Sequence, residues 1–143
     1  MSTNGNSYKW GNNLTASGSV IRNGWIAADN AWSSASNFNL FEHSNSVNTL
    51  NSWYESSSSY YGKMSTYVNQ TTKIVTKFEG YLNSGNTNIS KTNVAKSTAV
   101  HEFGHAMGIG HNSGTSIMNS QRNRETMHVP QTDDKNGIRA IYY

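Results

Sequence analysis

The 143-residue sequence contains no cysteine, and only 13% of its residues are charged. Without cysteine, the chain can form neither a disulfide framework nor a thiolate metal site, so packing has to stabilise it. A chain of this length can bury a sufficient core without such cross-links. We therefore expect a single domain over residues 1–143, with residues 1–7 as a flexible N-terminal segment.

Long apolar runs and basic clusters are also missing. No apolar run approaches the roughly 20 residues that span a bilayer, so no membrane partner is expected. The net charge is +3, but the lysines and arginines lie singly apart from Arg122 and Arg124. Because they form no basic stripe, we do not expect a nucleic-acid partner.

The start of the chain, M-S-T-N-G-N, is polar and carries no apolar signal segment. Two interpretations fit this observation: a cytoplasmic protein, or the mature segment of a secreted protein with an added start methionine. The surface is solvated mainly by Asn and Ser rather than by charges, which favours the secreted, extracellular interpretation. A monomer is the default expectation.

One stretch, H-E-F-G-H-A-M-G-I-G-H from His101 to His111, carries most of the functional information. On a helix, residues four positions apart lie about 40° apart around the axis, so His101 and His105 would project from one face. Their imidazole nitrogens can then bind one metal ion. Gly108 can adopt the left-handed conformation that ends a helix, which allows the chain to turn and bring His111 in as a third ligand.

Glu102 follows the first of these ligands and can reach a water molecule bound to the ion, on which it would act as base. Three protein ligands leave the fourth position of a tetrahedral zinc site open to water, as in catalytic sites. The pattern fixes five residues, and its chance occurrence in a chain this short is roughly one in 10⁵. We therefore predict one catalytic zinc ion.

The rest of the chain alternates between strand and helix patterns, which predicts an α/β domain. A helix is expected over residues 20–34, with Ser19 as its N-cap. The metal-binding helix should begin near residue 90 or 92, and a last helix near residues 131–133. Strands are expected over residues 8–16 with a bend at 11–13, and over residues 38–42, 52–55, 60–69 and 72–82.

The zinc motif, followed at a suitable distance by Ser116-Ile117-Met118, resembles the metzincin clan of zinc endopeptidases, which makes Met118 the expected methionine of the turn below the metal. Within the clan, the chain is most similar to a minimal bacterial matrixin, that is, a matrix-metalloproteinase-like catalytic domain. Two segments are similar to that family's first strand and last helix: Tyr8-Lys9-Trp10 with Leu14-Thr15, and Asp133-Asp134 with Gly137-Ile138 and Ala140-Ile141-Tyr142.

The resemblance implies a metzincin-type zincin domain with a twisted mixed sheet of about five strands, an active-site helix, a packing helix and a C-terminal helix. It also implies hydrolysis of extended polypeptide substrates, with Glu102 as general base and then general acid. The substrate would pair with an edge strand of the sheet. Our candidate residues for that edge are Tyr60, Tyr61, Met64 and Tyr67.

The specificity pocket implied by the resemblance would be walled by residues 119–130. Arg122, Arg124 and His128 lie in this loop, where they could favour an acidic or polar substrate side chain. The alternative, that they form a solvated loop face, stays open.

Departures from the family pattern limit the expected metal content. Only His43 and His128 remain for the second zinc of vertebrate matrixins, and the chain has only eight acidic residues for calcium sites. Ser120 stands where astacin-like and serralysin-like relatives carry a tyrosine ligand. We therefore expect one zinc ion, no second zinc ion and no calcium.

Two other functions remain open: a zinc-binding module without turnover, and a carbohydrate- or wall-binding module of the same fold. The intact Glu102 argues against the first. For the second, Trp10, Trp25, Trp32 and Trp53 could form a sugar-stacking platform, but core packing is the favoured interpretation.

Overall fold

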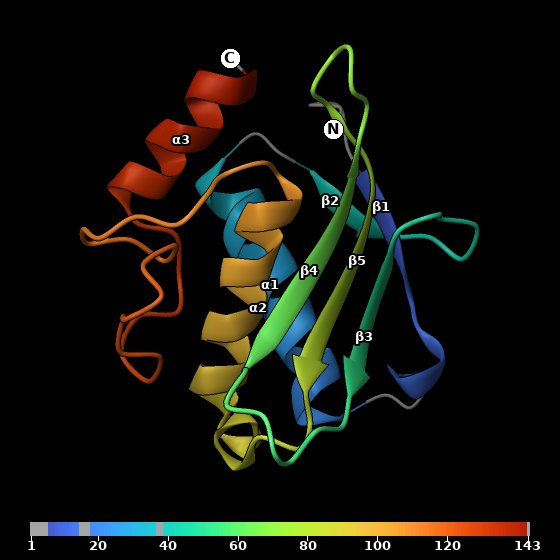
Figure 1. The fold of residues 1–143 in the computed structure, drawn as a ribbon, viewed down its shortest axis with the longest axis vertical. Helices are drawn as coiled ribbons and strands as arrows, with labels where there is room; N and C mark the ends of the chain where they lie inside the picture. The colour runs from blue at the N-terminus through green and yellow to red at the C-terminus, as the bar shows by residue number, and fades with distance from the viewer. Residues whose placement is uncertain (1–5, 15–17, 37–38, 143) are drawn as a thin grey trace.

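The computed structural model describes residues 6–14, 18–36 and 39–142. Along the chain, the elements are β1 (Asn6–Trp10), η1 (Asn12–Leu14), α1 (Val20–Ala35), β2 (Leu40–Glu42), β3 (Thr49–Trp53), β4 (Gly62–Val68), β5 (Val75–Asn83), η2 (Thr87–Ser90), α2 (Thr92–Ala106) and α3 (Thr132–Tyr142). Helices α1 and α2 pack against each other beside the sheet, and α3 stands apart from them (Figure 1). The predicted α/β class is confirmed.

The sheet has five strands in the order β2-β1-β3-β5-β4. Strands β1, β2, β3 and β5 run parallel, whereas β4 pairs antiparallel with β5 and forms one edge of the sheet. The predicted mixed sheet of about five strands is therefore confirmed. An edge strand presents main-chain N–H and C=O groups on its outer side, where another extended chain can pair with them.

The first strand differs from the prediction at both ends. It begins at Asn6, which pairs with Leu40, and Ser7 pairs with Phe41, so these two residues belong to the sheet and not to a flexible segment. Residues 1–5 of that predicted segment lie outside the described residues. The strand ends at Trp10, and the chain then turns in a 3-10 helix over residues 12–14, in which the Leu14 N–H donates to the Gly11 carbonyl at 3.0 Å.

Strands β3 and β5 are also shifted relative to the prediction. Strand β3 begins at Thr49, because Leu50 is fully buried and pairs in register with Gly80 of β5. Strand β5 begins only at Val75, because the side-chain oxygen of Asn69 accepts hydrogen bonds from the backbone of Thr71 and Thr72 and so holds a turn there. The first difference comes from a long-range pairing and the second from a local turn that the strand pattern overrode.

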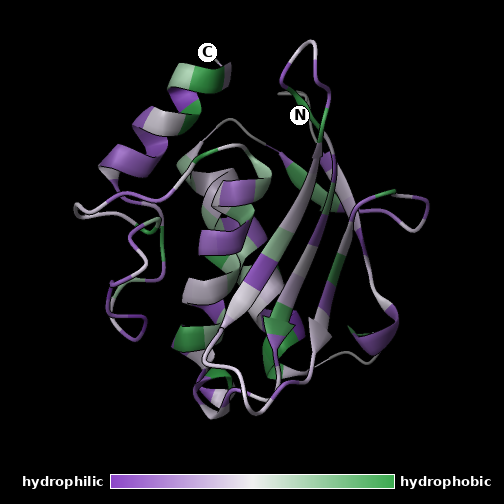
Figure 2. Ribbon diagram, in the orientation of Figure 1, coloured by the Kyte–Doolittle hydropathy of each residue, from purple (hydrophilic) through white to green (hydrophobic). Residues whose placement is uncertain are grey.

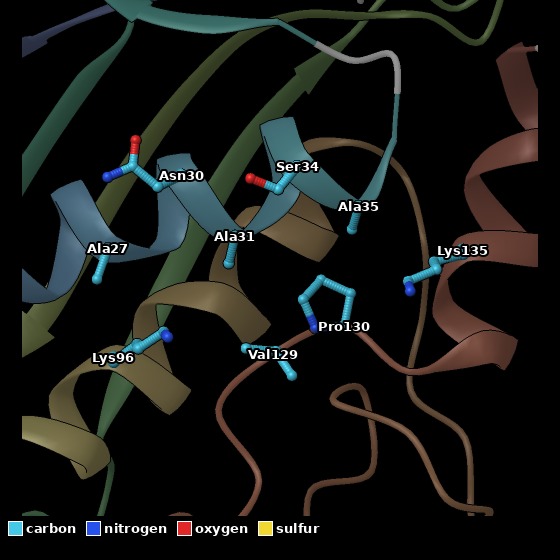
Figure 3. Close-up of a pocket in the computed structure, with 9 residues that line it drawn as sticks. All are labelled: Ala27, Asn30, Ala31, Ser34, Ala35, Lys96, Val129, Pro130 and Lys135. Carbon is cyan, nitrogen blue, oxygen red and sulfur yellow. The ribbon is translucent and has the colours of Figure 1, made fainter.

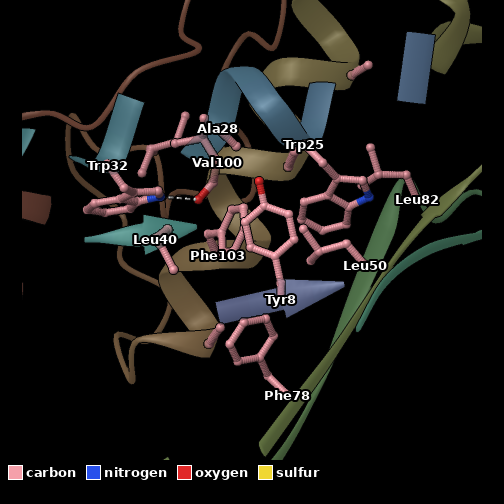
Figure 4. Close-up of a cluster of buried hydrophobic side chains, with 14 of the residues drawn as sticks. Tyr8, Trp25, Ala28, Trp32, Leu40, Leu50, Phe78, Leu82, Val100 and Phe103 are labelled. Carbon is pink, nitrogen blue, oxygen red and sulfur yellow. Dashed lines mark hydrogen bonds between the residues drawn. The ribbon is translucent and has the colours of Figure 1, made fainter. Parts of the chain in front are cut away.

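Helix α1 begins as predicted, since the Ser19 hydroxyl accepts a hydrogen bond from the Arg22 backbone N–H at 3.0 Å. Trp25 and Trp32 are 0% exposed in the core between the helices and the sheet (Figure 4), which confirms core packing for these two tryptophans. The indole N–H of Trp32 donates to the Val100 carbonyl of α2 at 2.9 Å. A four-tryptophan platform for sugars is therefore excluded.

The chain between α2 and α3 has no helix or strand and is mainly hydrophilic (Figure 2). Near its end, Val129 and Pro130 pass the outer face of α1 and line an open hollow of about 520 Å³ with Ala27 and Ala31 (Figure 3). None of the predicted site residues lines this hollow. Within the described residues, no helix has the length and apolar character needed to cross a membrane.

Candidate active site

Helix α2 carries two of the histidines and is itself mostly buried. It ends at Ala106, and the following Gly108 has a φ of 101°, in the left-handed region. The Gly108 N–H donates to the His105 carbonyl and the Ile109 N–H donates to the Gly104 carbonyl, both at 3.0 Å. This turn reverses the chain and brings His111 back to the histidines on the helix.

The three imidazoles converge on one point. His111 Nε2 lies 3.1 Å from His101 Nε2 and 3.1 Å from His105 Nε2. In a tetrahedral zinc site with Zn–N bonds of about 2.0–2.1 Å, neighbouring ligand atoms lie roughly 3.4 Å apart. Among the described residues, these histidines form the only group of three or more potential metal ligands.

The outer ring nitrogens fix the tautomers of the two helical histidines. His101 Nδ1 lies 2.8 Å from the Ile117 carbonyl oxygen, and His105 Nδ1 lies 3.1 Å from the Ile109 carbonyl oxygen. A carbonyl oxygen only accepts, so each Nδ1 carries the proton and each Nε2 presents a lone pair. Two lone pairs and His111 Nε2 then face one another, and a cation between them satisfies this arrangement.

Burial keeps the helical histidines neutral, which is the state that binds a metal. Burial, assisted by the charge of Arg122, lowers the pKa of His101 to about 3. Burial and the nearby His111 also lower the pKa of His105. The ligand set therefore fits a zinc ion in protonation state as well as in geometry.

A turn at Ser116–Met118 lies directly against α2. A side chain at Gly104 would clash with the Met118 Sδ atom, so glycine allows the methionine to pack directly on the helix. Met118 is 1% exposed. The turn places this methionine beside the helix that carries the histidines, and its Ile117 carbonyl orients His101.

Asp134, in the first turn of α3, holds this turn in place. Its buried carboxylate accepts hydrogen bonds from the Ser116 hydroxyl and, at 2.8 Å, from the Ile117 backbone N–H. A contact path therefore runs from α3 through Ile117 to His101. The sequence placed Asp134 in the last helix but did not pair it with this turn, because the partner residue Ile117 lies 17 positions away.

Glu102 is 7% exposed and lines the cleft beside the histidines. Burial raises the pKa of Glu102 to about 7, and the charges of Arg122 and Arg124 oppose this rise. A carboxyl group with a pKa near neutrality can both accept and release a proton.

The cleft has a volume of about 530 Å³ and runs between the edge of the sheet and the loop after the methionine turn. Helix α2 contributes Thr98, His101, Glu102 and His105 to it. The sheet side and the loop side are formed by Ser59, Tyr60, Tyr61, Gly62, Lys63 and Met64, and by Ser120, Gln121, Arg122 and Arg124.

The matrixin family model matches residues 23–143, a range that includes the helix, the histidines and the methionine turn. The chain belongs to the matrixin family. Matrixins are zinc metalloendopeptidases, and in this matrixin domain His101, His105 and His111 are positioned to bind a metal ion. Among curated proteins, none matches the chain closely enough to count as a relative.

The three basic residues of the matrixin loop have separate environments. Arg122 is 7% exposed, and its guanidinium donates to the hydroxyl and the carbonyl of Ser97, each at 3.0 Å. Arg124 is half-buried over the ring of Tyr61. His128 does not line the cleft. A solvated loop face is therefore the wrong description for Arg122, because this side chain ties the loop to α2.

The candidate residues of the edge strand differ in whether they lie in the strand and whether they line the cleft. Strand β4 begins at Gly62, so Tyr60 and Tyr61 precede it, although both line the cleft. Met64 lies in the strand and lines the cleft, whereas Tyr67 lies farther along the strand and does not. His43 is distant in sequence from the site and accepts a hydrogen bond from the Asn45 backbone in an exposed turn.

Proposed function

We propose that this matrixin domain is a zinc-dependent endopeptidase that cleaves extended polypeptides, with Glu102 as general base and general acid. The observation that supports the proposal is the convergence of the Nε2 atoms of His101, His105 and His111 beside the Glu102 carboxylate, in one cleft. Catalytic zinc sites combine three protein ligands with an adjacent acid and an open position.

When bound, zinc lowers the pKa of a water molecule and polarises a substrate carbonyl group. Glu102 accepts a proton from the attacking water and later delivers it to the nitrogen of the leaving amine. The Ile117 and Ile109 carbonyls hold His101 and His105 in the orientation that points each Nε2 inward. The chain thereby supplies both the ligands and the proton carrier.

The substrate is proposed to lie extended beside β4 and to pair with its outer main-chain groups. This placement is supported by the edge position of the strand and by the cleft that follows it past Tyr60, Tyr61 and Met64. Tyr67 is outside the cleft lining, so a contact with this residue would require a substrate that extends farther along the strand.

We propose one zinc ion per chain, no second zinc ion and no calcium, in a single catalytic domain over residues 1–143 that acts as a monomer. A secreted, extracellular location is supported by the few charged residues, 13% of the sequence, and by the matrixin family, whose members are generally extracellular.

The substitution Glu102→Gln tests this function, because it removes the proton carrier and keeps the size of the side chain. We expect casein cleavage to fall by about 10³-fold or more, with zinc content and circular dichroism unchanged. The matched control Glu42→Gln, at an exposed position of β2, should cleave as the unmodified protein does. Full peptidase activity in the zinc-loaded Glu102→Gln protein would exclude the proposed role.

A further inference from the structure

Arg124 places a positive charge in the cleft and forms no ion pair among the described residues, although it interacts electrostatically with the carboxylate of Glu102. The two ion pairs of the described structure join Lys77 to Glu79 and Lys91 to Glu125, and neither includes Arg124. Its Nε atom is buried and has no hydrogen-bond partner. A buried N–H group without an acceptor is costly, so this side chain is set up to receive one.

The Tyr61 ring holds the Arg124 side chain in place by stacking against it. The guanidinium carbon of Arg124 lies 3.9 Å from the centroid of the Tyr61 ring, which is a close cation–π contact. Stacking of this kind leaves the edges of the planar guanidinium free to donate hydrogen bonds to a carboxylate in bidentate geometry. Because the side chain is already ordered, an incoming anion does not have to pay for ordering it.

The charges around Arg124 have the same sign. Among the side chains that line the cleft, Arg122 and Arg124 are basic and Glu102 is the one carboxylate, while the ammonium of Lys63 lies over the rings of Trp53 and Tyr81. The lining is therefore positive before any metal is bound. A positive, partly buried cleft attracts anionic groups more strongly than an exposed basic surface does.

A smaller hollow of about 230 Å³ shares Tyr61, Arg122 and Arg124 with the cleft. Its other walls are mostly polar: Asn88 and Asn123 supply amide groups, and the one carboxylate, of Glu125, is paired with Lys91 at 3.2 Å. An apolar substrate side chain that entered between the two arginines would bury itself against charged and amide groups and leave them unpaired. A carboxylate would supply the missing acceptor.

We propose that the cleft selects polypeptides with an acidic side chain, Asp or Glu, which binds Arg124 in a subsite between Tyr61 and Arg122. This inference rests on the proposed endopeptidase function and names its substrate class. Arg124 is the residue that recognises the carboxylate. Arg122 backs the subsite and is itself held by Ser97.

The first experiment is digestion of a diverse peptide library by the zinc-loaded protein, with the cut sites mapped by mass spectrometry. We expect Asp and Glu to be enriched at one position at a fixed distance from the scissile bond. Two peptides that differ only by Glu or Gln at that position should then differ by about 10- to 100-fold in kcat/KM.

The variant Arg124→Gln should bring this Glu-to-Gln ratio close to one, and Arg124→Glu should shift the preference toward Lys or Arg at the same position. The control Arg139→Gln, at an exposed position of α3, should keep the original ratio. If Arg124→Gln fails to fold, Arg124→Lys should retain part of the acidic preference.

Two results would overturn the inference while leaving the endopeptidase intact: cleavage without an acidic preference, or an acidic preference that survives in Arg124→Gln. A zinc-loaded protein that cuts no peptide in the library would instead reject the proposed function, and the substrate class with it.

Discussion

The two sides of the cleft differ in burial. The metal side is formed by α2 and residues 116–118, and its polar atoms are buried and bonded to one another. The substrate side is formed by β4 and residues 120–124 and is largely exposed. On the metal side, His101 is bonded to Ile117, which is bonded to Asp134. On the substrate side, Arg124 stacks on the Tyr61 ring and forms no ion pair among the described residues.

The difference follows from what each side has to bind. A metal ion requires ligand atoms at fixed distances before it arrives, so its surroundings have to be rigid and fully hydrogen-bonded. A polypeptide brings its own donors and acceptors, so the surface that meets it keeps some groups unpaired. The two sides therefore respond differently to substitution, and that difference can be measured.

The largest effect is expected on the metal side from Asp134→Asn. This change removes the charge that three donors share, from Ser116, Ile117 and Gln131. We expect a loss of about 2–4 kcal/mol in the free energy of unfolding and a 10- to 100-fold weaker zinc affinity. Urea unfolding and a competitive zinc titration measure the two quantities.

The neighbouring residue provides the control for this prediction. Asp133→Asn alters an exposed carboxylate that accepts one hydrogen bond from Asn112 at 2.8 Å, so it should change stability by less than about 1 kcal/mol. Equal effects of the two substitutions would show that α3 does not fix the metal side through Ile117.

Substitutions of Arg122 and Arg124 should also differ in their effect on stability, although the two residues lie only two positions apart. Arg122→Gln removes a buried guanidinium that bonds to both oxygens of Ser97, and we expect it to cost about 2–3 kcal/mol. Arg124→Gln should cost less than about 1 kcal/mol, because Arg124 is half-buried and stabilised mainly by its cation–π contact. The denaturant midpoints of the two variants, measured side by side, test this prediction. A larger loss of stability in Arg124→Gln than in Arg122→Gln would show that Arg124, rather than Arg122, stabilises the fold.

A smaller effect is expected from Gly104→Ala. The added methyl group would clash with Met118 Sδ and displace it, at a cost of about 1–3 kcal/mol. The better helix propensity of alanine offsets this cost by about 1 kcal/mol. Gly110→Ala has open space around it and should stay within about 0.5 kcal/mol of the parent protein. The melting temperatures of the two zinc-loaded variants check this pair of predictions. An unchanged melting temperature in Gly104→Ala would contradict tight packing between the methionine turn and α2.

The metal side was predictable from sequence where its geometry is local. His101, His105, Gly108 and His111 lie within eleven residues, so helix periodicity and one turn determine how they meet. Asp134 was not recognised as their support, because its bond to Ile117 spans 17 residues and a carboxylate in a first helical turn has an ordinary explanation in the helix dipole.

The substrate side was harder to predict, because long-range pairing determines it. The pattern located a strand but began it two residues early, at Tyr60, because tyrosine favours strands whether or not a partner is present. Arg122 and Arg124 look alike in sequence. Only the packing of the loop on α2 buries one of them and leaves the other beside Tyr61.

The most direct test of a catalytic rather than structural metal is to follow casein cleavage and circular dichroism together while a chelator withdraws zinc and excess zinc is then restored. We predict that cleavage is lost and regained, while the folded spectrum persists with a lower melting temperature, because the core does not depend on the ion. Unfolding of the zinc-free protein would make the metal structural, and cleavage that survives complete zinc removal would contradict the account.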